Sequence, residues 1–181
     1  MVTREYSMKI NQVNFSYSPL EDRLLFRFNT LNKTEFRMWL TRAMRIKLLG
    51  QLHRIVEFNL LRERQGLETV TMKTVGEFRR EAALSRADYA QSFYSGAEAF
   101  PLGQQPILVT DVITDSSKPV SVVTFQLAIG QGLSLSLDHD LGVTISKLLS
   151  DVLDGLAWGV GMAKEMPMTN VGDPGKKMLL H

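Results

Sequence analysis

Three residue types suited to chemistry stand together at Asp138, His139 and Asp140, where an alternating segment ends and a helical pattern begins. Carboxylate oxygens and an imidazole nitrogen bind divalent ions, so the cluster is a candidate metal or ligand site that Asp111 or Asp115 would complete. The alternative is helix capping, because an Asp at a helix start accepts hydrogen bonds from free backbone amides. Adjacent residues seldom converge on one ion, and no His-x-His spacing occurs, so the pattern favours capping over a metal-dependent enzyme.

Other catalytic signatures are missing from the sequence. The chain has no cysteine, which excludes thiolate catalysis, disulfides and zinc–thiolate sites. No Gly-x-Ser-x-Gly turn occurs, and Gly130 and Gly132 lack the further residues of a phosphate-binding loop. We therefore expect no cofactor and no enzymatic activity.

Basic residues are concentrated in the first part of the chain. Residues 1–100 hold 16 Lys or Arg against 11 Asp or Glu, whereas residues 101–181 hold 5 against 8. Arg42, Arg45 and Lys47 fall on a predicted helix, where a basic ridge would bind nucleic acid or another polyanion. Opposite net charges on the two halves equally suit association between halves or between copies of the chain.

Trp39 lies on the opposite face of its alternating strand from Met38 and Leu40. It either belongs to a second buried layer or, together with Arg37, marks an exposed partner-binding face. Our first hypothesis is a non-enzymatic interaction or scaffold protein that self-associates. Its candidate partner-binding residues are Trp39, Arg37, Arg42, Arg45 and Lys47.

The elements that must position these residues form two similar sets. Apolar residues alternate over 13–17, 24–28 and 36–40, and again over 107–113, 123–129 and 133–137, which predicts six strands. Helical patterns follow at 41–64 and 140–159, each with a capping residue. Hairpin-length turns favour antiparallel pairing. We therefore predict an α+β fold of two antiparallel βββα units, a pseudo-repeat spanning about 12–64 and 107–159, packed into one sandwich-like core.

A helical connector is expected over about 65–106. Thr74 and Glu77 form a capping-box pattern, so a second helix is predicted to run to Tyr94 or Ala99 and to form a helical pair between the strand sets. The prediction is one domain over 8–160, with a frayed start and a mobile tail over 161–181.

The composition also bears on location. No window approaches the ~20 apolar residues that cross a bilayer, so we expect no membrane association. The lack of cysteine is compatible with the reducing cytoplasm, where we expect the protein.

The segment Glu35–Arg42, together with Pro101-Leu102-Gly103 before an Ile-Leu-Val strand, resembles a family of uncharacterised short bacterial proteins. The resemblance implies a bacterial origin and brings no known activity.

Overall fold

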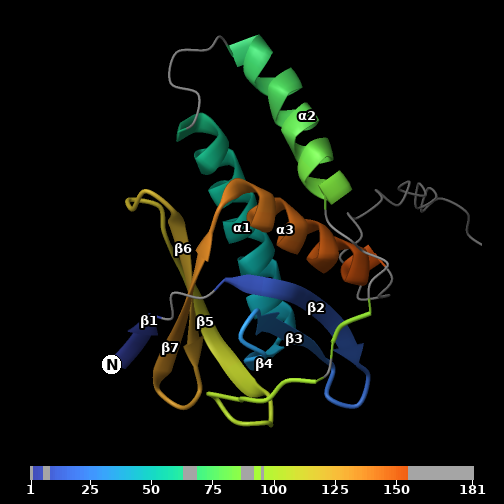
Figure 1. The fold of residues 1–181 in the computed structure, drawn as a ribbon, viewed down its shortest axis with the longest axis vertical. Coiled ribbons are helices and arrows are strands. Elements are labelled where there is room, and N and C mark those ends of the chain that lie inside the picture. Colours follow the sequence, from blue (N-terminus) through green and yellow to red (C-terminus); the bar gives the residue numbers. More distant parts are fainter. Residues whose placement is uncertain (1, 6–8, 63–68, 87–91, 95, 155–181) are drawn as a thin grey trace, which may run out of the picture.

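The computed structural model describes residues 2–5, 9–62, 69–86, 92–94 and 96–154. The chain folds as seven strands and three helices in the described part, which confirms the predicted α+β class (Figure 1). The strands are β1 (Val2–Glu5), β2 (Ile10–Ser18), β3 (Arg23–Thr30), β4 (Glu35–Leu40), β5 (Ile107–Asp115), β6 (Ser121–Leu127) and β7 (Gln131–Leu137). The helices are α1 (Arg42–Arg62), α2 (Thr69–Arg86) and α3 (His139–Asp154).

The strands form one mixed sheet in the order β1-β7-β6-β5-β4-β3-β2. Each predicted strand set is antiparallel internally, but the sets join through a parallel contact of Met38 with Ile107 and Trp39 with Leu108. The prediction of antiparallel pairing throughout is therefore wrong at this joint. Parallel neighbours need a long crossover, and the segment that contains α1 and α2 provides it.

The start of the chain also differs from the prediction. Val2–Glu5 form β1, which pairs in parallel with β7, from Val2 opposite Gln131 to Glu5 opposite Ser134. The expectation of a frayed start is therefore wrong for Val2–Glu5. The sequence did not reveal this strand, because four residues are too few to establish an alternating pattern. The predicted tail at 161–181 lies outside the described residues.

The helices agree in part with the sequence patterns. α1 begins as predicted after Thr41, whose hydroxyl accepts a hydrogen bond from the Met44 amide at 3.3 Å. α2 begins at Thr69 rather than Thr74, and it does not reach Tyr94. α1 and α2 form the predicted pair of helices between the two strand sets in the sequence. In space, α2 extends beyond the edge of the sheet (Figure 1).

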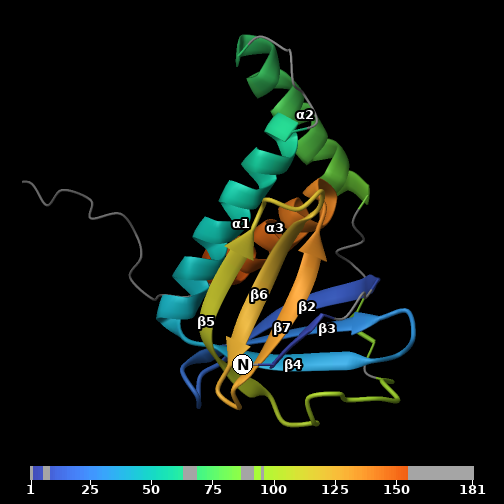
Figure 2. The same cartoon turned by 90° about the vertical axis from the view of Figure 1, so that its left-hand side faces the viewer.

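Both strand sets contribute to a single core. The two sets cross at a steep angle, and α1 and α3 lie on the same side of the sheet (Figure 2). Phe26 of β3 and Phe125 of β6 meet with ring centroids 5.5 Å apart. α1 packs against β5 and α3 against β2, so each set contacts the helix that follows the other. That the sets form a pseudo-repeat stays a prediction.

Candidate functional site

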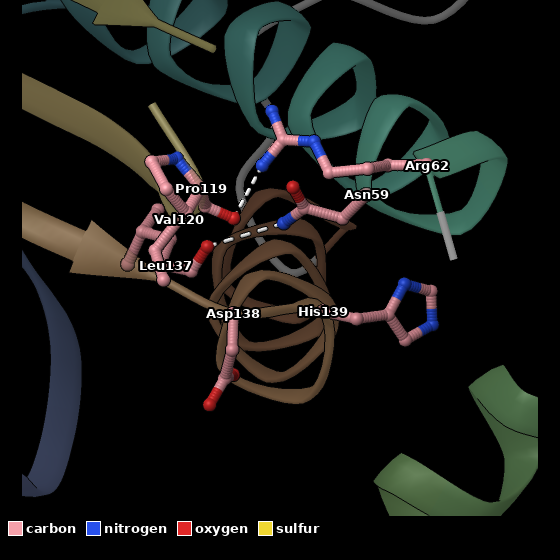
Figure 3. A pocket seen from close by; sticks show the side chains of 7 residues that line it. All are labelled: Asn59, Arg62, Pro119, Val120, Leu137, Asp138 and His139. Atoms are coloured by element: carbon pink, nitrogen blue, oxygen red, sulfur yellow. Dashed lines mark hydrogen bonds between the residues drawn. The ribbon is translucent and has the colours of Figure 1, made fainter. Parts of the chain in front are cut away.

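The predicted Asp138–His139 cluster borders a cavity of about 150 Å³ (Figure 3). Its lining comes from α1, from the β5–β6 hairpin, from the end of β7 and from the start of α3. The lining residues are Asn59, Arg62, Pro119, Val120, Leu137, Asp138 and His139. The cavity therefore lies where α1 meets both the hairpin and the third helix.

The polar groups of this cavity form hydrogen bonds between α1 and the neighbouring strands and hairpin. The buried Asn59 amide donates to the Leu137 carbonyl at 3.1 Å and accepts from the Ser121 hydroxyl at 2.8 Å. The Arg62 guanidinium donates to the backbone carbonyls of Ser116 and Pro119. These contacts fasten the end of α1 to the hairpin and to β7, and they occupy groups that a substrate would otherwise use.

Asp138 and His139 of the predicted metal site do different things, and the third residue, Asp140, is half-buried in the first turn of α3. Asp138 accepts a hydrogen bond from the Leu141 amide at 2.8 Å, which confirms the capping interpretation for this residue. His139 is 6% exposed, and its side chain points away from that of Asp138 (Figure 3). Neither ring nitrogen of His139 has a hydrogen-bond partner among the described residues.

The further carboxylates named for this site are also engaged elsewhere. Asp111 forms an ion pair with Lys47, and Asp115 accepts hydrogen bonds from Ser117. Within the described part of the chain, no group of three His, Asp or Glu residues is placed to hold a metal ion. Asp138, His139 and Asp140 are thus not arranged to bind one metal ion together.

The predicted basic residues are dispersed as well. Arg45 is 2% exposed, and burial together with the charge of Arg42 lowers its pKa. Lys47 is half-buried and paired with Asp111, and the Asp111 pKa is lowered by that contact and by the Val112 amide. Arg42 is exposed at the start of α1. These placements do not make one continuous cationic ridge.

Arg37 takes part in a second layer on the outer face of β2–β4. Its Nε atom donates to the fully buried Glu35 carboxylate at 2.7 Å. Its guanidinium carbon lies 4.8 Å from the centre of the Phe100 ring, and its Nη1 donates to the Gln104 carbonyl at 3.0 Å. Trp39 is half-buried on the same face. Arg37 is therefore part of the packing of this layer.

We call residues 92–94 and 96–104 the strap, because their contacts follow this outer face although they form neither a helix nor a strand. The Gln12 side chain accepts from the Tyr94 amide at 2.9 Å and donates to the Ser92 carbonyl at 3.4 Å. Arg27 lies over the Phe93 ring at 4.3 Å, and the Glu35 amide donates to the Ala99 carbonyl at 2.9 Å. The second layer considered for this face is thus an irregular segment without a helix or strand.

The edges of the sheet differ in how they are protected against pairing with another chain. After Leu108, α1 borders the side of β5 that faces away from β6. Lys47 of α1 forms an ion pair with Asp111 there, and Gln51 of α1 accepts a hydrogen bond from the Thr114 hydroxyl. β1, at one end of the sheet, has only four residues, two of them charged. Short, charged or covered edges resist pairing with other chains.

Within the described part of the chain, the edge of β2 is neither short nor charged, and no other strand pairs with it. β2 is nine residues long and, among the described residues, pairs only with β3. Its sequence contains no charged residue and no proline, and its only irregularity is a register shift between Ile10 and Gln12. Sequence reasoning missed this edge, although the uncharged run from Ile10 to Ser18 was the available signal.

No family model, no curated protein and no solved structure matches this chain. Among the described residues, no helix is long and apolar enough to cross a membrane.

Proposed function

We propose that this protein is a non-catalytic interaction module that receives a partner strand at the edge of β2. The supporting observation is a nine-residue, uncharged, proline-free strand at the end of the sheet. Such a strand presents a row of backbone donors and acceptors to another chain, which is the basis of recognition by strand addition. The self-association predicted from the opposite charges of the two halves is one form of this activity.

The position of β2 prepares its edge for binding. On the inner side, Phe15 stacks on Phe26 with centroids 4.6 Å apart, and α3 packs against the strand. On the outer side, Gln12 holds the strap. Because both faces are fixed, a partner strand would meet a strand that is already ordered, which lowers the entropic cost of association.

A lysine on the edge strand tests the proposal, since edge lysines are a natural protection against strand addition. The probe is a ten-residue peptide of alternating Val and Thr with charged ends, and the measurement is hydrogen exchange of the β2 amides. We expect the peptide to slow exchange in the native sequence and to lose this effect in Ser16→Lys. The matched control is Ser136→Lys, an exposed serine of β7, inside the sheet. Unchanged β2 exchange, both with peptide and at high protein concentration, would refute strand addition.

A further inference from the structure

We infer that the occupant of the β2 edge is a second copy of this chain, paired antiparallel with the first about a two-fold axis near Asn14. This inference rests on the proposed function and specifies its partner. A two-fold pair of identical strands forms an isologous interface, in which each end of β2 meets the opposite end of its copy. The composition of the two ends therefore decides whether the pair is favourable.

The apolar groups at the two ends are complementary in position. Leu20 lies two residues after the end of β2, in the turn that leads to β3, and is 94% exposed. Leu31 is 59% exposed, and it lies beside the other end, since its amide donates to the Lys9 carbonyl at 3.4 Å. Antiparallel pairing brings Leu20 of one copy to the end of β2 where Leu31 of the other lies on the β3 side. Two exposed apolar side chains would then lie near each end of the interface.

The charges at the two ends are complementary too. Lys9 is exposed immediately before β2. Glu21 is exposed in the turn after it, 3.6 Å from Arg23. In the two-fold pair Lys9 of each copy lies at the same end as Glu21 of the other, so the interface gains two equivalent attractive contacts. The uncharged strand between them brings no opposing like charges.

The middle of the strand suits continuation of the sheet. Val13 and Tyr17 are only partly buried, and they pack against the core beside the buried Phe15. A partner strand would extend this apolar row across the interface. Because strand pairing alone buries less area than the ~1,200 Å² of a typical stable interface, the contacts at the ends are needed for a specific dimer.

Sedimentation velocity over a range of concentrations tests the inference with four proteins: the native sequence, Lys9→Glu, Glu21→Lys and the double variant. Each single reversal places like charges together at both ends, so we expect the dimer dissociation constant to rise by about tenfold or more. The double variant exchanges the two charges and should restore dimerisation. The control Arg54→Glu changes an exposed charge on α1 and should leave dimerisation unchanged.

Two results would overturn the inference. One is a monomer at every concentration, and the other is a dimer that neither single reversal weakens. The hydrogen-exchange measurement then separates the two proposals. If the Val–Thr peptide still protects the β2 amides, strand addition stands and only the second copy is refuted. If neither the peptide nor a high protein concentration slows exchange of the β2 amides, both proposals fail.

Discussion

Arg37 and Glu35 point to the same outer face of β4, and Arg37 Nε lies 2.7 Å from Glu35 Oε1. The Glu35 side chain is fully buried, whereas that of Arg37 is 26% exposed. A buried carboxylate is costly unless a cation and hydrogen bonds compensate it. Arg37 therefore matters more for the stability of the outer layer than for a free partner-binding surface.

We predict that Arg37→Met lowers the free energy of unfolding by about 3 kcal/mol, because it leaves the Glu35 charge buried without its ion pair. Urea unfolding followed by circular dichroism measures the change. Arg54→Met removes an exposed arginine of α1 and should cost less than about 0.5 kcal/mol. Equal costs for the two variants would contradict the structural role of Arg37.

The strap gives a second prediction. Gln12→Ala removes both side-chain contacts to the strap and should destabilise the protein by about 1 kcal/mol. Exchange of the Tyr94 amide should become faster. Gln12→Glu keeps an oxygen that accepts from the Tyr94 amide but loses the donor to Ser92, so its Tyr94 amide should stay protected. Equal exchange in Gln12→Ala and the native protein would show that Gln12 does not hold the strap.

The sequence predicted the parts of the fold that depend on local periodicity. Phe26 and Phe125 follow strict alternation, and both are buried as expected. Arg45 shows what charge-based reasoning overlooked. It precedes Leu48 by three residues and Leu52 by seven, so helical spacing places it on their buried face, and it is 2% exposed.

Other features depend on contacts that periodicity does not encode. The parallel joint of the sheet consists of Met38 opposite Ile107 and Trp39 opposite Leu108. It depends on the path of the strap, which brings the start of β5 beside β4. The side-chain amide of Gln12 holds residues that are far away in sequence. For the candidate site, spacing identified the cap at Asp138. It did not reveal that β2 lies at the end of the sheet, because that position depends on strand order.

The contact between Lys47 and Asp111 predicts a pH dependence. Lys47 and the Val112 amide lower the pKa of Asp111 below its ordinary value of 3.8, so the folded protein binds this proton less readily than the unfolded chain. The contact therefore stabilises the fold above that value, and its contribution is lost as the pH falls through the lowered pKa. Carboxyl NMR titration should show the pKa of Asp111 rising in Lys47→Met.

Asp115 provides an internal reference for that titration. Hydrogen bonds from Ser117 lower its pKa, and Lys118 rather than Lys47 is the nearby charge. The pKa of Asp115 should therefore be the same in Lys47→Met and in the native protein. A shift of both carboxylates, or of neither, would contradict the assigned cause.

Asp138 separates helix capping from metal binding in a final prediction. Its carboxylate accepts from the Leu141 amide at 2.8 Å, so Asp138→Ala should lower the free energy of unfolding by about 1 kcal/mol. Asp138→Ser should recover most of that loss, because a serine hydroxyl caps a helix but is a poor replacement for a carboxylate ligand. Thermal unfolding with and without Zn²⁺ or Mg²⁺ measures both effects. A cap requires the metal to leave the melting temperature unchanged in all three proteins, whereas a rise in the native protein that Asp138→Ser abolishes would establish Asp138 as a ligand.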